Sequence, residues 1–128
     1  MTPEKATRLA DEWIAYWEHQ FRTGKFPPSS HSDDLEDAVR NTPDLAWDAI
    51  KLVVNQAKAS PYHEKLVEVL AAGPVEDLLR LHGPAVIDRV ETEARRSPAF
   101  NNVLGGVWSS SISPTVWARI EHIRNSVW

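Results

Sequence analysis

The sequence predicts an all-α protein, and three observations support that fold class. Apolar residues recur at three- and four-residue steps along most of the chain, which is the spacing of amphipathic helices, and the strict alternation typical of strands is almost absent. Of nine prolines, seven follow Ser, Thr or Gly, which is the order of an N-cap and a first helical residue. The 128 residues have the length of one domain and contain no long linker. We therefore expect a single compact domain over residues 1–128, with about six to seven short antiparallel helices.

Four helices are predicted in the N-terminal half. The first carries apolar residues on one face and ends at Gly24, before an extended loop with two prolines. The second opens with a run of acidic side chains, which the positive end of a helix dipole tolerates. The third and the fourth each begin at a proline that follows Thr or Ser. The expected ranges are residues 3–22, from 30–33 to 41, from Pro43, and from Pro61.

Two Gly-Pro pairs divide the centre of the chain. Gly73 is expected to end one helix in the left-handed conformation and to cap the next, with Pro74 at its first position. Glu76 then lies at the third helical position, where its carboxylate can accept from the N–H of the cap residue. Gly83-Pro84 repeats the pattern, so we expect three separate helices within Leu66–Trp108.

Two further proline pairs and a glycine pair organise the C-terminal part. Ser97-Pro98 opens a turn or a short helix, Gly105-Gly106 forms a bend, and the last helix begins at Pro114. The helical spacing of Trp108 and Trp117 predicts that both are buried in the core.

Composition excludes several classes of protein. There is no cysteine, so disulfides and thiolate metal sites are absent, and we expect no metal and no cofactor. The formal net charge is −4 and no basic stripe occurs, which argues against direct binding to nucleic acid. No segment approaches the ~20 apolar residues of a membrane span, and the N-terminus lacks the apolar run of a signal peptide. These observations predict a cytoplasmic protein without a membrane association.

One stretch resembles a known family. Residues 71–79 read AAGPVEDLL, His82-Gly83 follows, and Gly106-Val107-Trp108 lies further on. Together these motifs resemble a bacterial family of small helical domains of unknown function, with the likeness covering residues 44–120 and weaker over the first helix. The resemblance implies a helical fold and no particular reaction. Short antiparallel helix pairs are also loosely similar to HEAT repeats, although no repeat period is visible.

Two clusters of polar residues suggest chemistry. His63-Glu64 begins a zinc-protease motif, but that motif needs a second His at the position of Val67, so no metal site is predicted. The second cluster combines carboxylates, an imidazole and a guanidinium, which are the parts of an acid–base or anion site if they converge. Helix capping and surface ion pairs explain the same residues without chemistry, and no catalytic residue is assigned. The residues of this cluster are Glu76, Asp77, His82 and Arg95.

The remaining candidates are binding residues. Residues 1–42 carry eight acidic and five basic side chains, and the acidic ones concentrate at the start of the second helix. Such a surface suits a protein partner with a basic surface. A terminal tryptophan can also anchor a partner, because Trp is frequent among the residues that dominate binding energy. The candidate binding residues are Asp33, Asp34, Glu36, Asp37 and Trp128.

These observations predict a non-enzymatic bacterial protein-binding domain, in its most concrete form an immunity-type or inhibitor-type protein in a conflict with a toxin or a phage. Two alternatives stay open. The chain is a small enzyme or ligand-binding domain if Glu76, His82 and Arg95 surround a pocket, and a structural module if an apolar face is completed by a second copy in a homo-oligomer.

Overall fold

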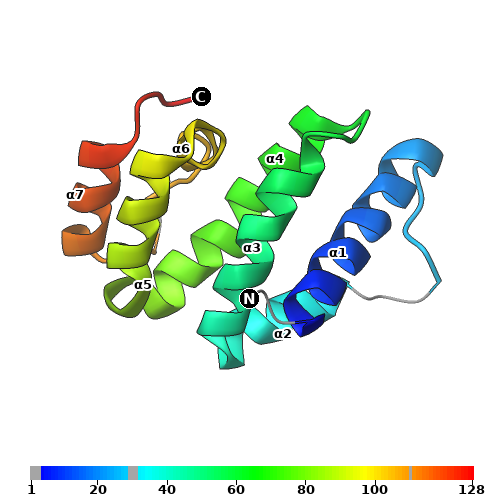
Figure 1. Cartoon of the computed structure of the whole chain (residues 1–128), viewed down its shortest axis with the longest axis horizontal. Helices are drawn as coiled ribbons and strands as arrows, with labels where there is room; N and C mark the ends of the chain where they lie inside the picture. Colours follow the sequence, from blue (N-terminus) through cyan, green and yellow to red (C-terminus); the bar gives the residue numbers. More distant parts are fainter. Residues whose placement is uncertain (1–3, 29–31, 110) are drawn as a thin grey trace. The chain divides into compact units, whose positions relative to one another are not determined.

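The chain folds entirely into helices, as the sequence predicts. The structure, a computed structural model, describes residues 4–28, 32–109 and 111–128, with the side chains of Ser32 and Asp33 excepted. No strand occurs in these ranges, and Figure 1 shows the helices in chain order. The elements are α1 (Glu4–Thr23), α2 (Ser32–Asn41), α3 (Pro43–Ala57), α4 (His63–Leu70), the π-helical segment η1 (Ala71–Val75), α5 (Glu76–Arg96), α6 (Pro98–Leu104) and α7 (Pro114–Ile123).

The contacts divide the chain into two compact units, Met1–Val67 and Glu68–Trp128, which we call unit 1 and unit 2. Each unit has its own buried apolar residues, and each is described separately. The single domain expected over residues 1–128 stays a prediction.

Unit 1 is built from α1, α2 and α3, together with the start of α4. Its buried side chains come from one face of each helix, as the apolar spacing predicts, and include Trp13 of α1, Leu35 of α2 and Ile50 of α3. Gly24 ends α1 in the left-handed conformation, with φ 75°, and its N–H donates to the carbonyl of Gln20. A left-handed residue ends a helix because the chain turns away from the helix axis there.

The two proline-initiated helices of unit 1 differ from the prediction in detail. Thr42 is the N-cap of α3, but its side chain accepts no capping bond, and Pro43 occupies the first turn. At Ser60 the hydroxyl accepts from the N–H of Tyr62 at 3.0 Å and donates to the carboxylate of Glu18 at 2.5 Å. This turn delays the start of α4 until His63, two residues after the predicted start.

In unit 2 the predicted break at Gly73-Pro74 is wrong. The helix continues through both residues as η1, and Gly73 does not have a positive φ. A proline inside an α-helix removes one hydrogen bond and collides with a carbonyl of the preceding turn. A π-helical turn is wider, and here the N–H of Glu76 donates to the carbonyl of Ala71, five residues earlier. The chain therefore accommodates Pro74 by widening one turn.

The second predicted break is a kink instead of a helix end. His82 has φ −132° and ψ 21°, outside the helical region, and α5 continues past Pro84 to Arg96. Gly83 is buried, and a Cβ built on it would lie 3.0 Å from Cγ2 of Val116 in α7. Glycine at this position therefore allows α5 and α7 to approach closely, so its role is in packing.

The predicted N-caps of α6 and α7 are confirmed. The hydroxyl of Ser97 accepts from the N–H of Phe100 at 3.1 Å, and that of Ser113 accepts from Val116 at 3.4 Å. Each satisfies one of the N–H groups that a helix start leaves without a partner.

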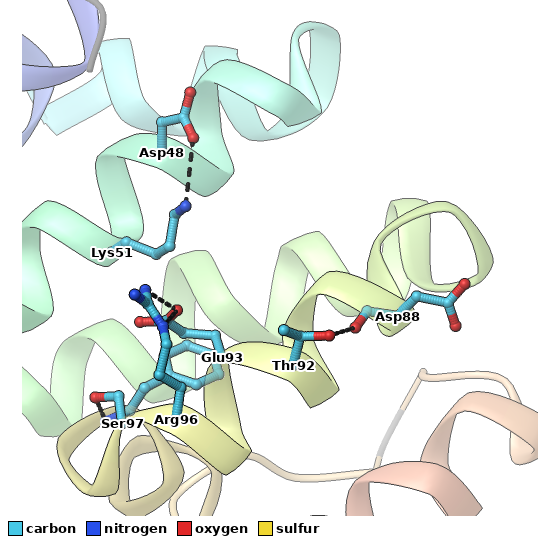
Figure 2. Close-up of polar contacts among 8 residues, drawn as sticks. Asp48, Lys51, Asp88, Thr92, Glu93, Arg96 and Ser97 are labelled. Carbon is cyan, nitrogen blue, oxygen red and sulfur yellow. Dashed lines mark hydrogen bonds and ion pairs between the residues drawn. The ribbon is translucent and has the colours of Figure 1, made fainter. Parts of the chain in front are cut away.

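Surface polar groups mostly form local pairs along one helix, and Figure 2 shows examples from each unit. In α3, Asp48 and Lys51 form an ion pair at 3.7 Å. In α5, Arg96 donates to Glu93 at 2.6 Å, and the hydroxyl of Thr92 donates to the carbonyl of Asp88 at 2.9 Å. Exposed pairs of this kind contribute only ~0.2–1 kcal/mol each, so they support the helices without defining a site.

Candidate protein-binding surface

The turn that follows α6 contains two adjacent glycines, Gly105 and Gly106. Three successive N–H groups, those of Gly105, Gly106 and Val107, donate to carbonyls three residues earlier, at 3.0, 3.0 and 3.2 Å. Gly105 has helical angles, φ −63° and ψ −22°, so the backbone itself does not require glycine there. Both glycines are buried, which means that another group covers them.

The covering group is the segment after α7. Arg124 has extended angles, φ −73° and ψ 140°, and residues 124–128, which we call the tail, return to α6. The N–H of Trp128 donates to the carbonyl of Gly105 at 3.0 Å. A Cβ on Gly106 would lie 2.3 Å from a ring carbon of Trp128, and one on Gly105 would lie 2.9 Å from its Nε1. The indole therefore lies directly against the two glycines.

Asn101 holds the start of the tail. Its side chain is 4% exposed, and its amide N–H donates to the carbonyl of Ala94 at 3.3 Å and to that of Ile123 at 3.0 Å. Both carbonyls lie near helix ends, and Ala94 has no helical donor four residues later because that position is Pro98. The side-chain oxygen of Asn101 accepts from the N–H of Asn125 at 2.8 Å. One buried amide thus satisfies two helix ends and fixes the tail.

Three exposed apolar side chains lie on this turn and on the tail that covers it, and we call them the tryptophan surface: Trp108, Val127 and Trp128. Their exposed fractions are 72%, 66% and 52%. The predicted burial of Trp108 is wrong, because its helical spacing does not apply after α6 ends at Leu104. Trp117 is half-buried. The exposure of Trp128 at about half agrees with one covered face and one open face.

Two charged residues support this surface and both have partners within unit 2. The N–H of Trp108 donates to the carboxylate of Glu76 at 2.9 Å, so Glu76 fixes the turn and does not form the predicted capping box. The guanidinium of Arg124 donates to the carbonyls of Leu104 and Val107 at 3.4 and 3.3 Å. It also lies 4.8 Å from the ring centre of Trp117. The tryptophan surface itself therefore consists of uncharged side chains.

An ion pair joins α7 to α5 and so positions the helix that carries the tail. Arg119 donates to both carboxylate oxygens of Glu91, at 3.0 and 2.5 Å, and to Asp88 at 2.6 Å. The hydrogen bond from Arg119 lowers the pKa of the Glu91 carboxyl below its ordinary value, and the two carboxylates raise the pKa of Arg119.

The predicted polar cluster is spread along α5. Glu76 bonds Trp108, Asp77 pairs with Arg80 at 3.4 Å, and His82 lies at the kink. Arg95 is exposed in the last turn of α5, thirteen residues after His82, which corresponds to about 20 Å along a helix axis. The structure therefore does not bring Glu76 and Arg95 together.

The acidic residues of α2 lie at the surface of unit 1. Asp34, Glu36 and Asp37 are exposed, and the side chain of Asp33 lies outside the described residues. Asp37 bonds Arg40 of the same helix. With Lys5 and Arg8 of α1, Asp34 and Asp37 line an open hollow of about 280 Å³. Basic side chains of the same unit therefore share this surface with the acids.

In the described ranges, no three His, Asp or Glu residues are grouped so as to hold a metal ion. None of the helices in those ranges combines the length and the apolar character needed to cross a membrane. The cytoplasmic location stays a prediction.

Comparison with protein families gives a match over most of the chain. The model of a family of unknown function, DUF6869, matches residues 20–127. The chain belongs to this family. The match covers α2 to α7 and the last turn of α1, so DUF6869 includes the whole tryptophan surface except Trp128. Searches of curated proteins and of solved structures found no significant match. The AAGPVEDLL motif as a DUF6869 signature and the likeness to HEAT repeats stay predictions.

Sequence reasoning identified Trp128 but missed the residues that place it. Asn101 is a polar residue among the apolar positions of α6, and such a residue signals a buried hydrogen-bonding role. Two adjacent glycines suggest that another group packs closely on them. The group that does so, Trp128, is brought there by the tertiary path of the tail, which no local sequence pattern contains.

Proposed function

We propose that this member of DUF6869 is a protein-binding domain that contacts its partner through the tryptophan surface. The observation that carries the proposal is the exposure of Trp108, 72%, on a turn that is fixed by hydrogen bonds from both sides. Tryptophan is enriched among residues that dominate binding energy, and a turn whose backbone is already fixed loses little conformational entropy on binding.

The size of the surface supports the same function. With ~250 Å² for a tryptophan side chain, the exposed fractions of Trp108, Val127 and Trp128 amount to roughly 400 Å² of apolar area. Patches of about 300–600 Å² are the largest on typical monomeric proteins and are often functional. The uncharged character of the three side chains matches the centre of protein interfaces, where charged residues are depleted.

The narrower role, an immunity-type or inhibitor-type protein, is supported by the exposed carboxylates of Asp34, Glu36 and Asp37 in α2. Lys5 and Arg8 beside them reduce the local negative charge. The alternative of an enzyme receives no support from the placement of Glu76, His82 and Arg95.

A site-specific crosslinking experiment tests the proposal. A photoreactive phenylalanine analogue replaces Trp108 in the native host, and the matched control carries it in place of Phe26, which is 57% exposed in unit 1. We expect a crosslinked protein from position 108 and none of the same mass from position 26. With the purified partner, Trp108→Ala should weaken binding about 30-fold or more, as for a dominant interface tryptophan.

The control variant for affinity is Phe26→Ala, which removes an aromatic ring of similar exposure and should leave binding unchanged. A partner whose affinity is the same for the wild type, Trp108→Ala and Trp128→Ala would show that the tryptophan surface is not the binding site.

A further inference from the structure

We propose that, when no partner is bound, the tryptophan surface pairs with the same surface of a second copy of the chain around a two-fold axis. The inference rests on the proposed function, because it takes the tryptophan surface as a docking surface. It goes further in naming what covers the surface when no partner is bound, which is a second copy of the chain.

The shapes of the two indoles are complementary. Trp128 lies against Gly105 and Gly106 with one face, so its other face is a flat apolar surface. Trp108 is 72% exposed and lies two residues beyond Gly106, so its Cα is within about 7 Å of the Gly106 Cα. In a two-fold pair each contact occurs twice with the partners exchanged. Trp108 of each copy can therefore pack on the open face of Trp128 of the other copy.

Charge favours this face over others for self-association. The chain carries a formal net charge of −4, so two copies repel each other at most orientations. The tryptophan surface is uncharged, and the two charged residues that support it, Glu76 and Arg124, bond to groups of their own unit. A contact between these three side chains therefore brings no charged side chains of like sign together, whereas a contact through the acidic residues of α2 would.

The area is appropriate for one side of a protein interface. A standard interface buries about 800 Å² per partner, of which somewhat more than half is apolar. The tryptophan surface offers roughly 400 Å² of apolar area, and exposed polar residues beside it, such as Asn102 and Ser126, can supply the remainder. The apolar area of the tryptophan surface is therefore close to the apolar share of one side of a standard interface.

Sedimentation equilibrium from about 1 to 300 µM tests the proposal with purified protein. We expect a monomer–dimer equilibrium for the wild type and for the control Phe26→Ala. Trp108→Ala and Trp128→Ala should each raise the dissociation constant of the dimer at least about tenfold. Because the contact is apolar and salt screens the repulsion between the two acidic chains, 0.5 M salt should not weaken the dimer.

A mixture of the two variants is the decisive measurement. In a mixed dimer the intact Trp108 of one copy meets the intact Trp128 of the other, so one of the two reciprocal contacts is retained. In either variant alone both contacts are lost. We therefore expect an equimolar mixture of Trp108→Ala and Trp128→Ala to dimerise several-fold more tightly than either variant by itself.

Two results would overturn the inference. One is a wild-type protein that stays monomeric up to the highest concentration, and the other is a mixture that associates no better than its components. Neither result affects the proposed function, because crosslinking from position 108 to a partner does not require a dimer. Circular dichroism of each variant establishes that the exposed substitutions leave the helices folded.

Discussion

Substitution of Gly106 by alanine gives the sharpest test of how the tail is held. Alanine at a glycine with a compatible backbone normally stabilises a protein by ~0.4–1 kcal/mol, because it restricts the unfolded chain. Gly106 does not have a positive φ, so the backbone accepts alanine. The new Cβ would, however, lie 2.3–2.8 Å from three ring carbons of Trp128. The indole must move, so we expect Gly106→Ala to destabilise the protein instead of stabilising it.

The burial of Trp128 limits the size of the loss. Trp128 is 52% exposed, so roughly half of a ~250 Å² side chain, about 120 Å², is covered. At ~25 cal/mol per Å² this corresponds to about 3 kcal/mol as an upper limit. We therefore expect Gly106→Ala to lower the free energy of unfolding by about 1–3 kcal/mol, measured by urea unfolding with circular dichroism.

The matched control is Gly73→Ala in η1. Gly73 also lacks a positive φ, and a Cβ there would have no atom within 4 Å, so this variant should be stabilised by ~0.4–1 kcal/mol. A double-mutant cycle isolates the contact: in the Trp128→Ala background, Gly106→Ala should be neutral or stabilising. If Gly106→Ala stabilises the wild type, or costs the same in both backgrounds, the close contact with the indole is not what requires glycine.

Three further predictions concern the support of this surface. Asn101→Leu leaves two carbonyls and one N–H without partners, so the free energy of unfolding should fall by about 2–3 kcal/mol, measured in urea, and protease should cleave the tail faster. Gly83→Ala should lower the melting temperature because its Cβ would meet Val116 at 3.0 Å, and Val116→Ala should recover part of the loss. The folded pKa of Glu91 is lowered, so its pair with Arg119 stabilises fully above about pH 5 and less as pH falls; Glu91→Gln should flatten that acid-side decline in melting temperature.

Local sequence rules predicted the elements whose signals are local. Ser97 and Ser113 cap α6 and α7 because a hydroxyl reaches the N–H three residues later in any fold. The helix break predicted at Gly73-Pro74 is wrong because a proline is compatible either with the start of a helix or with a widened turn inside one. The burial of Ala71, Pro74 and Val75 agrees with the second, since it keeps one continuous helix against the core of unit 2.

The candidate site was predicted only in part for a similar reason. The residue type of Trp128 is enough to suggest an anchor, but Trp108 has the spacing of a buried helical position although the helix ends at Leu104. The links that build the surface join residues 24 positions apart, Asn101 and Asn125, and 32 positions apart, Glu76 and Trp108. Such pairs depend on the tertiary path of the chain, which periodicity and capping rules do not specify.

The distribution of the six tryptophans gives the protein a built-in optical probe. Trp13 and Trp47 of unit 1 are buried, with exposed fractions of 2% and 4%, whereas Trp108 and Trp128 are exposed to solvent. A collisional quencher such as acrylamide will therefore quench the fluorescence of Trp108 and Trp128 more strongly than that of Trp13 and Trp47. Loss of quenching on adding a second protein, or on concentrating the chain, reports coverage of that surface without any label.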